Sequence, residues 1–198
     1  MGGTSTSVNG AAASALPPFR IDYAISPQDL KDIAELFLEY TNGLGIDLAY
    51  QSFEQELAGL PGKYASPHGV LLIARGISGS SKPIGCVALR PLPLPELAPA
   101  STPAASKRSK RSELKRLYVR SDARGTGLGE ALARRALDEA VALGYNEVVM
   151  DTLESMMPAR KLYTKLGFSE TTAYYETPIA ETVFYRRTFY DKSPFPAM

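Results

Sequence analysis

The segment between residues 113 and 152 constrains the fold more than any other part of this 198-residue chain. A segment that ends in the apolar residues Leu117–Val119, Glu113–Val119, is followed by three glycines spaced two apart, by a long amphipathic stretch and by a second short segment, Asn146–Thr152, with the apolar centre Val148–Met150. Segments of this length and composition between turn residues indicate strands. Because a helix that joins two strands of one sheet makes a right-handed crossover, the segment predicts two parallel strands linked by a helix.

The stretch that follows the glycines has the clearest helical period in the chain. Its apolar residues recur along one side and its charges form opposite-sign pairs on the other, as in a helix packed against a core. Gly144 ends the pattern, as expected for the residue that follows a helix. The apolar rows are Leu128, Leu132, Ala136, Ala140 and Ala133, Leu137, Val141, and the charge pairs are Glu130/Arg134, Arg134/Asp138 and Arg135/Glu139.

The rest of the chain supplies further strands and helices around this unit. We expect the order strand, two helices, three strands, helix, strand, helix and two strands, which makes the fold class α+β with one mixed sheet. Two runs separated by a Gly/Ser turn, Val70–Arg75 and Ile84–Arg90, predict an antiparallel hairpin. The other expected elements are a strand at Arg20–Ile25, a helix that Ser26 caps and Gly43 ends, a helix from near Asp47, a helix that Ser155 caps and Gly167 ends, and strands at Phe168–Tyr174 and Glu181–Phe189.

A single domain accounts for most of the chain. We expect it over residues 19–190, after a disordered leader at 1–18 and before a short tail at 191–198. Pro91–Arg111 contains five prolines and no periodicity, so it is predicted to be a flexible insertion between two strands. The start MGGTST matches the template for N-myristoylation, although a polar leader explains it more simply.

Composition excludes several classes of function. Lys and Arg total 22 against 21 Asp and Glu, so no basic surface for nucleic acid is indicated. No apolar run approaches the roughly 18 residues of a membrane span, so we expect no membrane partner. A single cysteine, Cys86, and a single histidine, His68, leave neither a disulfide framework nor a zinc site. No metal is therefore expected, and the cytoplasm is the expected location, with the nucleus as an alternative.

The glycine turn at Arg124–Gly129 is suited to binding an anion. Amides at a helix N-terminus have no partner within the helix, and glycine permits positive φ and a close approach of the backbone to a phosphate. Two common phosphate motifs do not fit: the Rossmann motif needs glycine where this chain has Glu130, and the Walker A sequence is absent. A tight turn that packing alone requires is the alternative.

Two motifs in this part of the chain resemble those of a known family. The sequence RGTGLG, Arg124–Gly129, resembles the pyrophosphate-binding signature of the GNAT acyltransferase superfamily, and it follows a strand that ends in Leu117–Val119. About 30 residues later, ARKLYTKLGF, Ala159–Phe168, resembles the family's second cofactor helix. The resemblance covers roughly residues 20–190. It implies the GNAT fold, a mostly antiparallel sheet of about seven strands whose fourth and fifth strands are parallel, with about four helices.

The resemblance implies an N-acetyltransferase with acetyl-CoA as its co-substrate. The pyrophosphate would lie on the amides of the glycine turn, and the amide of Val119 would polarise the thioester carbonyl. Many relatives carry Asn where this chain has Met156, so Ser155 is expected to replace that contact, although helix capping would also explain the serine. The expected cofactor-binding residues are Leu117, Tyr118, Val119, Arg124, Gly125, Thr126, Gly127, Leu128, Gly129 and Ser155.

Two residues are expected to carry catalysis. Glu113 resembles the strand glutamate that serves as general base in the histone acetyltransferase branch. Strand alternation predicts that it shares one face with Lys115, Leu117 and Val119. Tyr163 is at the family position whose phenol protonates the departing CoA thiolate. The alternatives are an ordinary surface glutamate paired with a neighbouring cation and a tyrosine that belongs to the core.

The expected acceptor is a primary amine of a small molecule, which attacks the thioester directly in a ternary complex. An amino acid whose carboxylate meets Arg90 or Arg116 is the first candidate. The alternatives are transfer to a lysine or N-terminus of a protein, and an acyl-CoA sensor without transfer. Dimers are common in the family, so a homodimer is among the assemblies that the resemblance allows.

Overall fold

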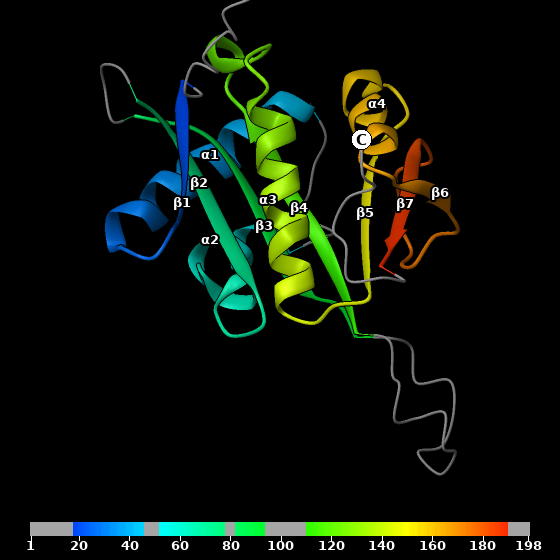
Figure 1. Cartoon of the computed structure of the whole chain (residues 1–198). Helices are drawn as coiled ribbons and strands as arrows, with labels where there is room; N and C mark the ends of the chain where they lie inside the picture. Colours follow the sequence, from blue (N-terminus) through cyan, green and yellow to red (C-terminus); the bar gives the residue numbers. More distant parts are fainter. Residues whose placement is uncertain (1–17, 46–51, 78–81, 94–109, 190–198) are drawn as a thin grey trace, which may run out of the picture.

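The computed structural model describes residues 18–45, 52–77, 82–93 and 110–189, which form one seven-stranded sheet with helices on both faces (Figure 1). The strand order is β1-β2-β3-β4-β5-β7-β6, and every neighbouring pair is antiparallel except β4 and β5. This confirms the predicted order of elements and the predicted fold class. The elements are β1 (Phe19–Tyr23), α1 (Pro27–Leu44), α2 (Phe53–Ala58), β2 (Val70–Gly76), β3 (Pro83–Pro91), β4 (Arg111–Val119), α3 (Leu128–Ala142), β5 (Glu147–Leu153), α4 (Met157–Lys165), β6 (Ser169–Thr171) and β7 (Thr182–Thr188), with short 3-10 turns at Gly62–Tyr64 and Ser121–Ala123.

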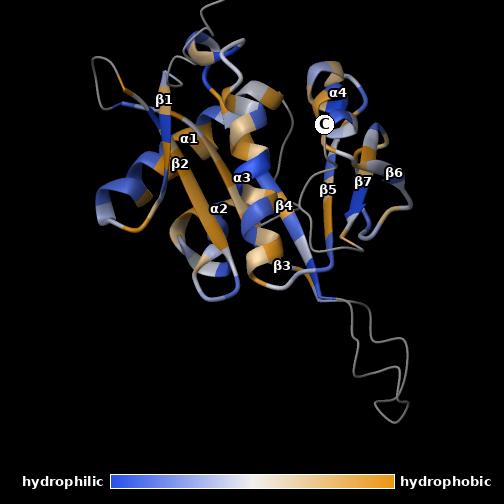
Figure 2. Cartoon of the chain, in the orientation of Figure 1, coloured by the Kyte–Doolittle hydropathy of each residue, from blue (hydrophilic) through white to orange (hydrophobic). Residues whose placement is uncertain are grey.

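The middle of the sheet is buried on both faces. Leu72 and Ala74 of β2 belong to the core cluster under α3, whereas Leu71 and Ile73 belong to the cluster under α1. Figure 1 shows α3 crossing one face while α1 and α2 lie on the other. Strands covered on both sides are apolar at nearly every position, as the orange of most of β2 in Figure 2 illustrates.

The parallel pair in the middle of the sheet is short. Residues 111–113 of β4 pair with residues 147–149 of β5, and no later residue of these two fully described strands continues the pairing. Both strands nevertheless run on, to Val119 and Leu153, and Figure 1 shows them separating toward α4. The two strands therefore present unpaired edges to each other over their second halves.

A β-bulge at Arg116 changes which face the residues of β4 occupy. Arg116 has φ +57°, and Cys86 and Ala88 of β3 pair with Tyr118 and Lys115, so one residue of β3 opposes two of β4. The strand alternation expected for Glu113 is therefore wrong beyond this point.

The two halves of β4 present opposite faces. Before the bulge, Lys115 pairs with Ala88 on the α1 side of the sheet. After it, Leu117 and Val119 pack into the cluster under α3. Glu113 and Lys115 consequently do not share a face with Leu117 and Val119.

Several predicted boundaries need correction. Helix α4 begins at Met157, and Met156, not Ser155, occupies its N-cap position, because Pro158 already fits the first turn. The last two strands are shorter than expected, and residues 172–181 between them form a loop. Pro91 and Arg111 are strand residues, so the connection between β3 and β4 is shorter than expected.

Some predictions concern residues that the structure does not describe. The expected leader and tail lie almost wholly outside the described residues. So do residues 46–51, where the second helix was expected to begin, and residues 94–109 of the insertion.

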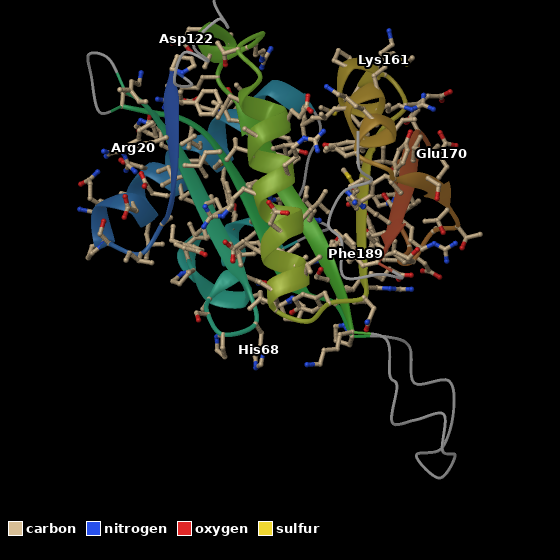
Figure 3. The ribbon with its side chains drawn as sticks, viewed as in Figure 1. Arg20, His68, Asp122, Lys161, Glu170 and Phe189 are labelled. Carbon is tan, nitrogen blue, oxygen red and sulfur yellow. The ribbon has the colours of Figure 1, made fainter. Side chains whose placement is uncertain are left out.

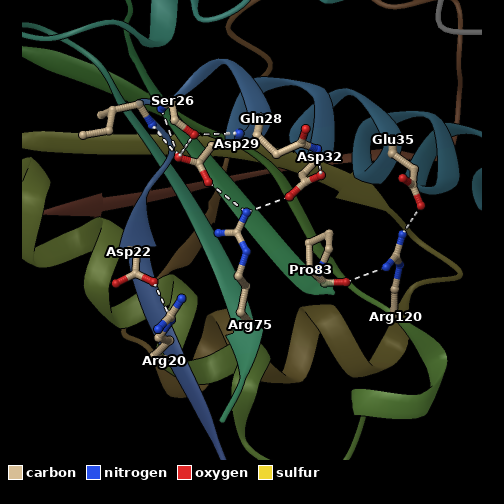
Figure 4. Close-up of polar contacts among 11 residues, drawn as sticks. Arg20, Asp22, Ser26, Gln28, Asp29, Asp32, Glu35, Arg75, Pro83 and Arg120 are labelled. Atoms are coloured by element: carbon tan, nitrogen blue, oxygen red, sulfur yellow. Dashed lines mark hydrogen bonds and ion pairs between the residues drawn. The ribbon is translucent and has the colours of Figure 1, made fainter. Parts of the chain in front are cut away.

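Two buried arginines fasten α1 to the sheet (Figure 4). Arg75 of β2 contacts Asp29 at 2.8 Å and Asp32 at 2.6 Å. Arg120, after β4, contacts Glu35, Glu39 and the carbonyl oxygen of Pro83. Because charge-assisted contacts in partly buried positions are stronger than those in water, these pairs hold α1 against β2 and against the end of β4, a strand that lines the site described below.

We predict that Arg75→Ala lowers the free energy of unfolding by about 2–3 kcal/mol, because two partly buried carboxylates lose their cation. Arg20→Ala is the matched control, since Arg20 pairs with Asp22 at 3.0 Å on the surface, with 62% of its side chain exposed. Its expected cost is below about 0.5 kcal/mol. Urea unfolding measures both, and equal costs would contradict the role of Arg75.

Candidate functional site

A pocket of about 500 Å³ lies where β4 and β5 diverge. Its walls come from β4, β5, α4, the end of α1 and the start of α3. Of the residues expected at the site, it is lined by Leu117, Tyr118, Val119, Arg124, Gly129 and Tyr163. The pocket thus combines the two end residues of the glycine turn with the expected catalytic tyrosine.

The glycine turn leaves backbone amides without helical partners. Gly125 and Gly127 have φ +78° and +83°, and Gly127 is the N-cap of α3. The first hydrogen bond of the helix runs from the Ala131 amide to the Gly127 carbonyl, so the three amides before Ala131 have no acceptor within the helix. These amides and the 15-residue helix behind them favour a bound anion.

Two side chains of the turn have structural contacts. The Thr126 hydroxyl donates to the Ala123 carbonyl at 2.8 Å, and the Arg124 guanidinium donates to the Val119 carbonyl at 3.1 Å. The side chain of Leu128 is buried in the core, so only its amide is placed to meet an anion. Glu130 is held by Lys165 at 2.6 Å and Arg134 at 2.8 Å, which offsets the negative charge beside the turn.

The amide of Val119 faces the gap between the strands. The carbonyl oxygen of Tyr118 points at β3, where it would lie 2.8 Å from a Cβ placed on Gly85. Because the C=O and N–H of one trans peptide point in opposite directions, the Val119 N–H points toward β5, which no longer pairs here. A donor fixed at this place is suited to polarising a carbonyl oxygen.

Tyr163 combines a buried ring with a hydroxyl at the pocket. The ring packs against Phe168 and Tyr185, with both centroids 6.0 Å away, and 5% of the residue is exposed. Its hydroxyl makes no hydrogen bond with any described residue. Burial raises the pKa of this phenol, and the nearby Tyr40 and Asp151 raise it further, so the group keeps its proton. Both the core role and the acid role expected for Tyr163 are compatible with this position.

The structure does not bring Glu113 to the pocket wall. Its side chain is 1% exposed and forms an ion pair of 2.6 Å with Arg90 through Oε2. The Tyr174 hydroxyl donates to Oε1 at 3.0 Å, and the Lys115 ammonium lies 3.5 Å from the same oxygen. Both carboxylate oxygens are therefore engaged, and a role as base stays a prediction.

Other expected residues also lie away from the pocket lining. Ser155 is exposed, and its carbonyl accepts a hydrogen bond from the Met157 amide, while its neighbour Met156 reaches the wall. Arg90 is not among the lining residues. Arg116 is, but Glu56 already holds its guanidinium through two hydrogen bonds of 2.9 and 2.7 Å. Neither arginine is thus a simple receptor for an acceptor's carboxylate.

The sequence reasoning missed Asp151. This residue lies on β5, lines the pocket and keeps 20% of its side chain exposed. The Lys115 ammonium is 3.7 Å from Oδ1, and the Tyr174 hydroxyl is 3.5 Å from it. A carboxylate directly after the apolar residues Val148–Met150 of a predicted strand was the signal that could have identified it.

Cys86 and His68 take no part in this pocket. Cys86 is fully buried, burial raises the pKa of its thiol, and the thiol donates to the Arg116 carbonyl at 3.4 Å. Figure 3 shows His68 at the end of the molecule opposite Lys161 of α4.

Among the described residues, no three His, Cys, Asp or Glu side chains gather as a metal site would require. In the same part of the chain, no helix has both the length and the apolar character needed to cross a membrane.

Comparisons with known proteins agree with this geometry. The model of the acetyltransferase (GNAT) family matches residues 30–168. An uncharacterized N-acetyltransferase of Schizosaccharomyces pombe is 39% identical over 160 residues, which cover 81% of this chain and 88% of that protein. Human N-acetylaspartate synthetase is 38% identical over 81 residues, 37% of this chain and 27% of that protein. The crystal structure of Arabidopsis thaliana NAA60 in complex with acetyl-CoA superposes with a TM-score of 0.62 at 16% identity, over 86% of this chain and 98% of that one.

The chain therefore belongs to the GNAT acetyltransferase family. It is an N-acetyltransferase, and acetyl-CoA is the co-substrate that this family uses. The amide donors at the glycine turn and at Val119 are groups that fit the pyrophosphate and the thioester of such a co-substrate.

We predict that Gly127→Ala raises the Kd for CoA about tenfold, because a methyl group would occupy the space over the amides that a phosphate must approach. Gly144→Ala is the matched control at the other end of α3. Both glycines have positive φ and nothing within 4 Å of an added Cβ, so both variants should lose about 1 kcal/mol of stability. Calorimetric titration compares their affinities, and an equal Kd in the two variants would contradict the anion site.

We predict that Tyr163→Phe lowers kcat by about 10²–10⁴, the usual contribution of a general acid, with little change in the Kd for acetyl-CoA. Its stability should change little, because the hydroxyl has no hydrogen-bond partner among the described residues. Tyr145→Phe is the control, since its hydroxyl donates to the His68 carbonyl at 2.6 Å, away from the pocket. Unchanged turnover in Tyr163→Phe would exclude the acid role.

Proposed function

We propose that this N-acetyltransferase acetylates the primary amine of a small molecule, by direct attack of the amine on acetyl-CoA in a ternary complex. The observation that supports this most is the single pocket that holds Val119, Tyr163 and Asp151 together. It places a fixed N–H donor, a protonated phenol and a carboxylate around one space. These are the groups that aminolysis of a thioester requires.

The reaction proceeds through an addition and an elimination. The lone pair of the amine nitrogen forms a bond to the thioester carbon, and the carbonyl π electrons move to the oxygen, which the Val119 N–H stabilises. The C=O bond then re-forms as the C–S bond breaks and its electron pair stays on sulfur. Tyr163 donates its proton to that sulfur, which leaves as the free thiol of CoA. The nitrogen releases one proton, which restores the phenol, so the amide and the thiol are the products.

The size of the pocket favours a small acceptor. Its volume of about 500 Å³ must hold both the acyl end of the co-substrate and the acceptor. Tyr40 and Leu44 of α1 and Ile179 and Thr182 near the start of β7 are among its lining residues. This is the size of an ordinary small-molecule site, not of an extended protein groove.

An amino acid is the acceptor class that we favour. The similarity to N-acetylaspartate synthetase, over about a third of the chain, supports an acceptor of this kind. The pocket supplies Asp151 for the amino group of such an acceptor. We assign no cation to its carboxylate, since Lys115 already contacts Glu113 and Asp151, and Arg90 and Arg116 already hold Glu113 and Glu56.

We predict that a panel of free amino acids and simple amines will contain a substrate whose kcat/KM exceeds that of every peptide with a free N-terminus or lysine by at least about tenfold, roughly 1.4 kcal/mol of selectivity. Release of the CoA thiol measures turnover for each acceptor. Turnover of peptides alone would instead assign a protein-modifying enzyme. Saturable binding of acetyl-CoA without turnover of any amine would assign a sensor.

A further inference from the structure

We infer that Asp151, not Glu113, accepts the proton that the acceptor amine releases, and that Glu113 is a positioning residue for the groups around Asp151. This inference rests on the proposed acetylation of an amine. It assigns a further catalytic residue on β5, at the point where this strand has left β4.

Asp151 lies where β5 has separated from β4. Val149 is the last residue of β5 that pairs with β4, and its partner is Glu113. Asp151 is two residues further on, where the strands have separated, so its side chain lies at the opening that becomes the pocket. Glu113 is at the last paired position, under the closed part of the sheet, which explains its exposure of 1% against 20% for Asp151.

The carboxylates of Glu113 and Asp151 differ in how closely their neighbours hold them. Glu113 is held by Arg90 at 2.6 Å and by Tyr174 at 3.0 Å, distances of full hydrogen bonds. The corresponding contacts of Asp151, with Lys115 and Tyr174, are 3.7 and 3.5 Å long. Asp151 therefore keeps the capacity to accept a new donor, whereas Glu113 would have to break an ion pair to do so.

Two polar groups link the two carboxylates. The Lys115 ammonium and the Tyr174 hydroxyl both contact Oε1 of Glu113, and both also contact Oδ1 of Asp151. Glu113 thus fixes the two donors that orient Asp151. The charged and titratable groups that face Asp151 are Lys115 and Glu113 from β4, Tyr174 from the loop before β7, and Tyr163 from α4.

The proton balance is complete with these groups. As the C–N bond forms, the N–H bond breaks, its electron pair stays on nitrogen and its proton passes to the Asp151 carboxylate. When the C–S bond breaks, the phenol proton of Tyr163 passes to sulfur. The proton on Asp151 then returns to the Tyr163 oxygen, directly or through water, so both residues end in their starting states and the amide and the thiol of CoA are the products.

The test compares Asp151→Asn, Asp151→Glu and Glu113→Gln in the full chain, with the best amine of the wild-type enzyme from pH 6 to 10. Asp151→Asn should lower kcat about 10²-fold at pH 7, and the loss should shrink as pH rises because hydroxide then takes the proton in place of the missing carboxylate. Asp151→Glu should recover part of the activity. Glu113→Gln should lower kcat less than about tenfold, by the same factor at each pH, since it loses no proton acceptor.

Calorimetric titration with CoA shows whether each variant still binds the co-substrate. The inference is supported if Asp151→Asn keeps its affinity for CoA and loses kcat in the pH-dependent way described above. A kcat within about threefold of wild type in Asp151→Asn, a loss independent of pH, or a pH-dependent loss in Glu113→Gln would overturn it. Absence of turnover by the wild-type enzyme with every amine is a different result, which overturns the proposed function together with the inference.

Discussion

The separation of β4 from β5 after three paired residues is the feature on which the rest of the structure depends. Backbone N–H and C=O groups inside a sheet normally form hydrogen bonds with the neighbouring strands. In this sheet the second halves of β4 and β5 do not pair with each other, so each keeps an unpaired edge. A positive-φ bulge at Arg116 accompanies the separation, and bulges increase local twist. Glu56 holds the Arg116 side chain at 2.7 Å, while its guanidinium lies 5.1 Å from the centre of the Phe53 ring, so α2 helps to fix the distorted strand.

The glycine turn and the strand edge supply two kinds of backbone donor to one co-substrate. Amides at the start of α3 are suited to the pyrophosphate, and the Val119 N–H is suited to the thioester carbonyl. Both are fixed by main-chain geometry, and Arg124 joins them because its side chain bonds the Val119 carbonyl. Donors that the fold holds in place need no reorganisation during the reaction, which is why a pocket built from strand ends is well suited to acyl transfer.

The elements that could be predicted from the sequence are those indicated by a short, continuous pattern of residues. The helix Leu128–Ala142, the strands on either side and the parallel pair follow from periodicity and chain connectivity. The bulge at Arg116 could not be predicted in this way, because the residues around it include no glycine or asparagine, the residues that usually indicate positive φ. Simple strand alternation therefore assigned the second half of β4 to the wrong face of the sheet. Asp151 was missed for a related reason: β5 resembles a wholly buried strand until its neighbour is known to diverge.

The central claim is that main-chain amides at the glycine turn and at Val119 hold the co-substrate. Amide chemical shifts of ¹⁵N-labelled protein, recorded during titration with CoA and then with acetyl-CoA, test it most directly. We expect large shifts at Gly127, Leu128 and Gly129 with either ligand, an added shift at Val119 when the acetyl group is present, and no shift at Gly144. Saturable binding with shifts confined to other parts of the sheet would contradict it.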